Sequence, residues 1–355
     1  MPKIAVIGAT TWGATLAVTL AQKGHYVRLV ARTPEEARQM RTNELYRLPL
    51  PENKFPPHVT FTTSPEKAMR DARAVILVVP AQSMRQNMRQ IASYVTENML
   101  IVSASKGLEL RTCKRMTEVI GEELPELYRK NICVISGPNL AREILGGHPA
   151  ATVFAATDMK VARAGQRLFN TDQLCVYTNT DVTGVELGGA LKNIVALAAG
   201  VADGLGFGDN AKAALMTRGL AEIQALGAAL GANPLTFSGL AGLGDVMATC
   251  SSPLSRNHYV GIELAKGRKL EDITDSMDNV AEGVPTTEAA WMLAKKLDIG
   301  MPITEKLYRL LYRGLSPERA ANELLNEETL HELEGRKWRL LRVVRKKSDS
   351  VAKLP

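Results

Sequence analysis

The feature that most constrains the fold is a change of pattern near residue 180. Before it, short apolar or β-branched segments alternate with stretches of helical spacing, and after it only helical patterns follow. The strand-like segments are KIAVIG (3–8), YVRLVAR (26–32), VTFTTS (59–64), AVILVVP (74–80), MLIVSAS (99–105) and NICVISGP (131–138). Such alternation predicts a parallel, doubly wound sheet. The segment from Ala74 to Pro80 has no polar residue, as expected for a strand covered on both faces.

We therefore expect an α/β domain over residues 1–180, an all-helical domain over 181–330 and a basic tail over 331–355. The formal net charge is +7, but residues 336–355 hold eight Lys or Arg against one Asp, and the rest of the chain is neutral. A basic body that binds nucleic acid is therefore not supported. The tail could contact lipid headgroups or an acidic partner, but the pattern favours a solvated terminal helix.

Targeting and metal-binding signals are absent from the sequence pattern. Cys113, Cys133, Cys175 and Cys250 share no short spacing, so we expect no zinc site and instead reduced, buried thiols in a cytoplasmic protein. The first apolar run is too short for a signal peptide. The stretch 187–202 is split by Lys192 and Asn193 and does not match a membrane span.

A glycine loop, GATTWG, follows the first predicted strand. Dinucleotide-binding folds use G-x-G-x-x-G there, with glycines at the turn, beside the pyrophosphate and at the helix–strand contact. This chain keeps Gly8 and Gly13 but has Thr10 in the middle position. A plain strand–helix turn would also fit the residues. The loop opens a helix in an alternating βαβ pattern, however, which favours a Rossmann-like nucleotide site.

The second predicted strand ends in Arg32 with no acid before Glu35. An acid at this point would bind the ribose 2′-hydroxyl of NAD, whereas an arginine suits the 2′-phosphate of NADP. A surface arginine at the start of the next helix fits as well. The sequence thus favours NADP(H) slightly and leaves NAD(H) open.

A lysine interrupts the most apolar helical stretch, VELGGALKNIVALAAGVADGL (185–205). Three and four positions from Lys192 lie only Gly188, Gly189, Val195 and Ala196, so its ammonium is placed among small and apolar groups. A snorkelling surface lysine could produce the same pattern. Lys106 after a strand, Asp245 in a glycine-rich segment, and Arg256 with Asn257 are further candidates for a common site.

These segments resemble the bacterial type of NAD(P)-dependent glycerol-3-phosphate dehydrogenase. The similarity runs from Gly8 to about residue 325 and is carried by SASKGLE, ISGPNLAREI, GVELGGALKNIVALAAGVADGLGFGDNAKAAL, TRGLAEIQALG, FSGLAGLGDVMATCSSPLSRN and VAEGVPTTEAA. The resemblance implies reversible reduction of dihydroxyacetone phosphate to sn-glycerol 3-phosphate, which supplies glycerophospholipid synthesis in the cytoplasm. It also implies the two-domain fold expected above.

By position, the resemblance makes Lys192 the catalytic proton donor and acceptor. It implies substrate contacts by Lys106, Gly137, Asn193, Asp245, Ser255, Arg256 and Asn257. It implies cofactor contacts by Gly8, Thr11, Trp12, Gly13, Arg32, Lys106, Ala141, Arg256 and Glu282. Gly188 and Gly189 would leave room for substrate. The chain departs from the family pattern at Thr10 and at Asn139–Leu140, which concerns the cofactor loop rather than the reaction.

Two other classes of function fit part of the pattern. A non-catalytic NADP(H) sensor would keep the glycine loop but would not need Lys192, Asp245 and Arg256 together. A dehydrogenase of another phosphorylated or carboxylated hydroxy compound would keep a lysine and an arginine. The apolar helical faces of the second domain are compatible with a homodimer, and a membrane role would rest only on residues 336–355.

Overall fold

The computed structural model describes residues 2–277 and 280–325, and the predicted basic tail lies outside these residues. An eight-stranded sheet forms the first part of the chain, in the order β3-β2-β1-β4-β5-β6-β7-β8. The strands are β1 (Lys3–Ile7), β2 (Tyr26–Val30), β3 (Val59–Thr62), β4 (Ala72–Leu77), β5 (Leu100–Ser103), β6 (Ile132–Ser136), β7 (Ala150–Ala156) and β8 (Leu174–Asn179). The six predicted segments all form strands, and they pair in parallel.

The sheet departs from the all-parallel prediction beyond β6. Strands β7 and β8 were not expected, and β7 pairs antiparallel with β6 before β8 pairs parallel with β7. The connection from β6 to β7 contains only the short helix α7 (Ala141–Leu145), so the chain returns beside β6 in the opposite direction.

Helices cover both faces of the sheet. Apolar residues of α1 (Thr11–Gln22), α2 (Pro34–Arg41), α7 and α8 (Met159–Phe169) pack on one face. The other face is covered by α3 (Pro65–Met69), α4 (Met84–Ile91) and α5 (Met116–Glu122). Short turns and a one-turn helix complete this part: η1 (Pro51–Asn53), η2 (Ala81–Ser83), η3 (Ala92–Tyr94) and α6 (Glu126–Arg129). The predicted doubly wound arrangement is confirmed.

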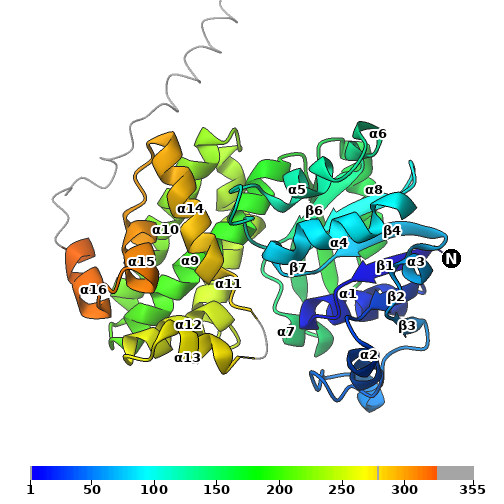
Figure 1. Ribbon diagram of the computed structural model, residues 1–355, viewed down its shortest axis with the longest axis horizontal. Helices are drawn as coiled ribbons and strands as arrows, with labels where there is room; N and C mark the ends of the chain where they lie inside the picture. Colours follow the sequence, from blue (N-terminus) through cyan, green and yellow to red (C-terminus); the bar gives the residue numbers. More distant parts are fainter. Residues whose placement is uncertain (1, 278–279, 326–355) are drawn as a thin grey trace, which may run out of the picture.

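The described chain after residue 180 is helical, as predicted, and lies beside the sheet (Figure 1). The central helix α9 packs against α10, α11, α12, α14 and α15. The elements are α9 (Val182–Gly204), α10 (Asp209–Ala229), η4 (Pro234–Ser238), the π-helical turn η5 (Leu240–Gly244), α11 (Asp245–Ser251), α12 (Arg256–Ala265), α13 (Leu270–Asp275), α14 (Gly283–Leu297), α15 (Pro302–Tyr312) and α16 (Pro317–Leu325).

By length and composition helix α9 could cross a membrane, although the stretch 187–202 was not expected to match a span. It is buried within the molecule from Gly184 to Ala202 and serves as the core of the helical domain. Its all-round apolar surface therefore reflects contact with protein on every side.

The four cysteines are unpaired, as expected. Only Cys133 and Cys250 are buried, however, whereas Cys113 is partly buried and Cys175 on β8 is exposed. The expectation that all four are buried is therefore wrong.

Candidate active site

The predicted catalytic residues meet where the carboxyl ends of the parallel strands face the helical domain. Lys106 follows β5 and Gly137 follows β6. Because neighbouring parallel strands end at the same edge of the sheet, the two residues lie at the same edge. Lys192 reaches this edge from α9, and Asp245 begins α11 after the π-helical turn η5. Four segments far apart in sequence thus contribute to one site.

Asp245 is the centre of this site. Its Oδ1 accepts a hydrogen bond from Lys192 Nζ at 2.8 Å, and its Oδ2 accepts one from Lys106 Nζ at 2.5 Å. The Asp245 residue is 1% exposed and Lys192 is 8% exposed. A buried carboxylate that accepts from two ammonium groups fixes both of them relative to each other.

Each lysine has one further protein partner. Lys192 Nζ donates to Thr249 Oγ1 at 2.5 Å, and Lys106 Nζ donates to the Gly137 carbonyl at 2.9 Å. An ammonium carries three N–H donors, so each lysine keeps one donor without a partner among the described residues. The site therefore presents two fixed cationic donors.

Burial and charge act in opposite directions on these groups. Burial tends to raise the pKa of Asp245, but the ammonium groups of Lys106 and Lys192 outweigh it and lower this pKa. Burial lowers the pKa of Lys106 to about 8, although Asp245 opposes the change. Asp245 is thus ionised at neutral pH, and Lys106 loses its proton more readily than an ordinary lysine.

The amides of Asn193 and Asn257 connect three helices beside Lys192. Asn257 Nδ2 donates to Asn193 Oδ1 at 2.9 Å, and Asn257 Oδ1 accepts from Gly283 N at 2.9 Å. Ser255 caps α12, because its Oγ accepts from His258 N at 3.3 Å. These three predicted substrate residues lie together at the start of α12 and on α9, held by contacts within the protein.

Arg256 is the first residue of α12 and remains exposed to solvent. Surrounding residues nevertheless lower the pKa of its guanidinium by burial, and the nearby charges of Glu282 and Tyr46 oppose this change. Among the described residues no hydrogen bond or ion pair holds the guanidinium. It is therefore a planar fork of donors that an anion could engage.

The glycine loop leaves no room for side chains at its two outer glycines. Gly8 has φ +114°, and a Cβ there would lie 2.3 Å from the Val78 carbonyl oxygen. A Cβ on Gly13 would lie 2.2 Å from the Gly8 carbonyl oxygen. Both positions thus admit only glycine without a shift of backbone.

Thr10, which replaces the usual middle glycine, turns its side chain back into the protein. Its Oγ1 accepts from Gly13 N at 3.0 Å and donates to the Val78 carbonyl at 3.3 Å. Thr10 therefore caps α1, and within the described chain the N–H groups of Thr11 and Trp12 have no partner. These two free donors at a helix N-terminus fit a phosphate group.

Arg32 is engaged by an acid that the sequence analysis did not single out. Its Nε and Nη2 donate to Glu36 Oε1 at 3.0 and 2.6 Å, and the Arg32 backbone N–H donates to Glu36 Oε2 at 2.5 Å. The Arg32 side chain is 85% exposed, whereas that of Glu36 is 8% exposed. Arginine and acid thus stand together at the end of β2, where the ribose of a dinucleotide would lie.

Glu282 joins the helical domain to the sheet domain. Its Oε1 accepts from Ala81 N at 3.0 Å, whereas its Oε2 is buried without a hydrogen-bond partner. Thr286 Oγ1, one turn further along α14, is also buried and unpaired. Burial raises the pKa of Glu282 to about 7. These unsatisfied groups fit a polar part of a ligand. Ala141 is the first residue of α7.

Thr249 and Glu36 are site residues that sequence reasoning missed. Thr249 lies one helical turn after Asp245 and therefore faces the same side of α11, so the i, i+4 spacing could have indicated it. Glu36 lies four residues after Arg32 and could have been found in the same way.

The glycines beside Lys192 serve packing. A Cβ on Gly188 would lie 2.3 Å from the Ala241 carbonyl oxygen, and one on Gly189 would lie 2.3 Å from Ser136 Oγ. The expectation that they leave room for substrate is wrong, because η5 and β6 occupy these positions. They allow α9 to approach both the sheet and the segment that carries Asp245.

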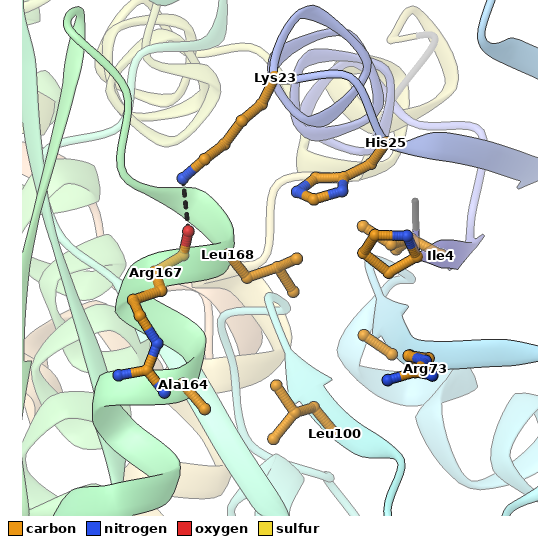
Figure 2. Close-up of a pocket in the computed structure, with 10 residues that line it drawn as sticks. Ile4, Lys23, His25, Arg73, Leu100, Ala164, Arg167 and Leu168 are labelled. Atoms are coloured by element: carbon orange, nitrogen blue, oxygen red, sulfur yellow. Dashed lines mark hydrogen bonds between the residues drawn. The ribbon is translucent and has the colours of Figure 1, made fainter.

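A separate cavity of about 290 Å³ lies at the opposite edge of the sheet, near the start of β1, β4 and β5 (Figure 2). Its floor includes Ile4, Leu100 and Leu168, and Lys23 on its wall donates to the carbonyl of Arg167. Of the ten residues that line it, none belongs to the predicted site. The cavity is therefore distinct from the residues around Asp245.

Family models and curated relatives that match this chain indicate the same family. Residues 3–162 match the N-terminal model and residues 181–322 the C-terminal model of NAD-dependent glycerol-3-phosphate dehydrogenase. A glycerol-3-phosphate dehydrogenase [NAD(P)+] of Dehalococcoides mccartyi is 55% identical over 348 residues, covering 98% of this chain and 97% of the relative. That of Shouchella clausii is 47% identical over 339 residues, covering 94% and 99%.

Solved structures agree with these matches. The crystal structure of glycerol-3-phosphate dehydrogenase from Coxiella burnetii superposes with a TM-score of 0.86 at 33% identity, covering 92% of this chain and 99% of that one. A D-mandelate dehydrogenase structure, with a TM-score of 0.59 at 15% identity over 90% of this chain and 99% of that one, shares the fold alone. The chain therefore belongs to the NAD-dependent glycerol-3-phosphate dehydrogenase family.

Proposed function

We propose that the residues around Asp245 carry out the reaction that names the family. The chain is an NAD(P)-dependent oxidoreductase that reduces dihydroxyacetone phosphate to sn-glycerol 3-phosphate reversibly. The observation that carries this proposal is the placement of two ammonium groups, of the partly buried Lys106 and the buried Lys192, on the two oxygens of one buried carboxylate. A simple nucleotide sensor would have no use for this arrangement.

Lys192 is the proposed proton donor in reduction and acceptor in oxidation. When bound, the nicotinamide cofactor supplies the hydride that the ketone carbon receives, or accepts it in the reverse direction. The free N–H of Lys192 donates to the ketone oxygen, stabilises the negative charge that develops there and passes its proton to it. Asp245 and Thr249 hold the ammonium in place, so little reorganisation is needed during the reaction.

The remaining residues hold the substrate. The free N–H of Lys106 is available to a substrate oxygen, and the unpaired guanidinium of Arg256 suits the phosphate. Gly137, Asn193, Ser255 and Asn257 complete the proposed substrate side. Binding energy from the phosphate would place the carbonyl carbon for reaction, since the phosphate itself does not react.

The proposed cofactor side comprises the glycine loop and the residues that flank it. Thr11 and Trp12 offer free backbone donors to the pyrophosphate, and the unpaired Oε2 of Glu282 offers a polar contact across the domains. Gly8 and Gly13 provide the close approach of backbone, while Arg32, Lys106, Ala141 and Arg256 complete the set.

We infer a slight preference for NADP(H) from Arg32. Its exposed guanidinium could engage a 2′-phosphate through charge-assisted hydrogen bonds, although Glu36 competes for it and could itself accept from a ribose hydroxyl. Arg32→Asp should therefore lower kcat/KM for NADPH about tenfold, with little change for NADH. Arg38→Asp on the following helix α2 is the matched control for lost surface charge. An unchanged NADPH/NADH ratio in Arg32→Asp would make Arg32 a surface residue.

Several finer features belong to the same proposal. We place the boundary between the two domains at residues 180 and 181, where β8 has ended and α9 begins. We also propose a cytoplasmic enzyme that supplies glycerophospholipid synthesis and forms a homodimer through its helical domain. Light scattering coupled to size exclusion tests the dimer. No membrane role is proposed for residues 336–355.

The decisive experiment is steady-state reduction of dihydroxyacetone phosphate with NADH and NADPH in parallel, followed as loss of nicotinamide absorbance. We expect turnover with both cofactors. A panel of 2-oxo acids is included because other dehydrogenases share the fold. Turnover of a 2-oxo acid without turnover of dihydroxyacetone phosphate would refute the proposed substrate.

A further inference from the structure

A buried ion pair outside the substrate and cofactor residues joins the two domains. Arg115 precedes α5 in the sheet domain, and Glu186 lies on α9 in the helical domain. Arg115 Nη1 lies 2.7 Å from Glu186 Oε2, with side chains that are 17% and 5% exposed. Neither residue was singled out from the sequence, and neither touches the Asp245 group.

Glu186 holds the start of α5 at several points. Its Oε1 accepts from the Thr117 backbone N–H at 2.8 Å, and its Oε2 accepts from both Arg115 and the Thr117 hydroxyl. Burial raises the pKa of this carboxyl, and Arg115 with Thr117 opposes the change. A buried ion pair contributes little to stability on average, since desolvation offsets its attraction. Its geometry is therefore the more informative property.

Arg115 and Lys106 stand at the two ends of one tight loop. Residues Leu108 and Arg115 form an antiparallel bridge, and within the loop Glu109 N donates to the Lys114 carbonyl at 2.9 Å. Gln82 holds the same loop through the Leu108 carbonyl at 2.8 Å and the Leu110 N–H at 2.9 Å. Because the loop is closed on itself, a shift of Arg115 moves the segment that bears Lys106.

Glu186 and Lys192 stand on one rigid helix. They are six residues apart on α9, which corresponds to about 9 Å along the helix axis. Between them, α9 touches the Lys106 segment directly. A Cβ on Gly189 would lie 2.3 Å from Ser136 Oγ and 3.6 Å from Lys106 Cδ. The ion pair and this close contact thus hold the sheet domain against helix α9 at two neighbouring points.

We propose that Arg115 and Glu186 are positioning residues that set the place of Lys106 in one domain against Lys192 in the other, so that both ammonium groups reach Asp245. This role rests on the proposed roles of Lys106 and Lys192. A one-ångström displacement of reacting groups can cost about a hundredfold in rate. The pair therefore acts on kcat without touching the substrate.

The test compares three variants with the wild-type enzyme. Glu186→Gln keeps the shape and an oxygen for Thr117 but removes the charge, and Arg115→Met removes the cation. Each substitution should lower kcat for dihydroxyacetone phosphate about ten- to a hundredfold. Glu118→Gln is the matched control, because Glu118 also pairs with Arg115, at 3.2 Å, from a 45% exposed position. It should leave kcat within about twofold, as expected for a surface pair.

The pH profile separates positioning from a purely structural role. The pKa of Lys106 is lowered to about 8 by burial, with Asp245 opposing and Lys192 adding to the decrease. Activity that needs the Lys106 ammonium should fall above about pH 8 in the wild type. In Glu186→Gln and Arg115→Met a loosened Lys106 is better hydrated, so this limb should move to higher pH.

The double variant completes the design. Arg115→Met with Glu186→Gln should be no slower than either single variant if the two side chains act as a unit. Variants that only melt earlier, with kcat and the alkaline limb unchanged, would overturn the positioning role. If Glu186→Gln does not fold, the Arg115→Met variant alone tests the positioning role. In that variant Glu186 can remain hydrogen-bonded to Thr117 as a neutral acid. A wild-type enzyme inactive on dihydroxyacetone phosphate would instead refute the proposed function.

Discussion

Lys192 is a buried lysine that is held in position by its hydrogen-bond partners. It lies in the buried stretch of α9, and Asp245 and Thr249 take two of its three N–H donors. Lys192→Met should keep the fold and cofactor binding but lower kcat by about 10²- to 10⁴-fold, because the proposed proton donor is gone. Stopped-flow reduction of dihydroxyacetone phosphate measures the effect. The control is Lys295→Met on the exposed side of α14, and near-normal turnover in Lys192→Met would eliminate the mechanism.

At the residue scale, sequence reasoning singled out Lys192 and Asp245, which the structure brings into contact, because each is a polar residue that breaks its local pattern. Lys192 stood out because its helical neighbours are small and apolar, and Asp245 because it is the single acid in a glycine-rich segment. Glu186 gave no such signal, since a glutamate in a helix is ordinary, and Thr249 could have been indicated only by its i, i+4 spacing from Asp245. Their roles depend on contacts with residues 57 and 71 positions away in sequence, which local patterns do not encode.

At the scale of elements, local pattern predicted the first six strands of the chain and missed the last two, β7 and β8. β7 is rich in alanine and β8 has exposed positions at Cys175 and Tyr177, so neither resembles a buried strand. Both form because they extend an existing sheet edge, and that edge is a tertiary feature. The helical half was easier to predict, since the 3.6-residue period is local.

Helix α9 also provides a prediction at this scale. Gly188→Ala would place a methyl group 2.3 Å from the Ala241 carbonyl oxygen, so η5 and the following Asp245 must shift. We expect a loss of about 1 to 3 kcal/mol in the free energy of unfolding, together with reduced kcat. Urea unfolding and steady-state kinetics measure the two effects. Gly300→Ala is the control, because nothing lies within 4 Å of its added Cβ. Equal stability of the two variants would show that η5 adapts freely.

At the scale of the whole molecule, the two domains are joined by polar contacts that no single element predicts. Glu186 contacts Arg115 and Thr117, Asp245 contacts Lys106, and Glu282 contacts the Ala81 backbone. The partners lie after strands β4 and β5, in loops or at the starts of η2 and α5. Which residues of the helical domain they meet depends on the relative placement of the two domains. The sequence predicted two domains and placed Lys106 and Asp245 in a shared site, but it did not predict the contacts of Glu186 with Arg115 and Thr117.

Glu282 makes the stability of the whole molecule depend on pH. Burial raises its pKa to about 7 in the folded protein, whereas an exposed glutamate has a pKa near 4.3. Between these values the folded state retains a proton that the unfolded state has lost. Stability therefore falls as pH rises through this window and stays lower above about pH 7. Because the side chain is only partly buried, we expect a cost of about 1 to 2 kcal/mol, below the full value of the shift.

Glu282→Gln tests this dependence. Glutamine can still accept from Ala81 N but does not ionise. The variant should therefore not lose stability as pH rises. Measured by urea unfolding without cofactor, the variant should match the wild type near pH 5 and exceed it by about 1 to 2 kcal/mol near pH 8. Glu288→Gln on the same helix controls for the removal of one carboxylate. A difference between wild type and Glu282→Gln that stays constant from pH 5 to pH 8 would show that Glu282 is ionised throughout, and the interdomain contact would then be a charged one stabilised by Arg256.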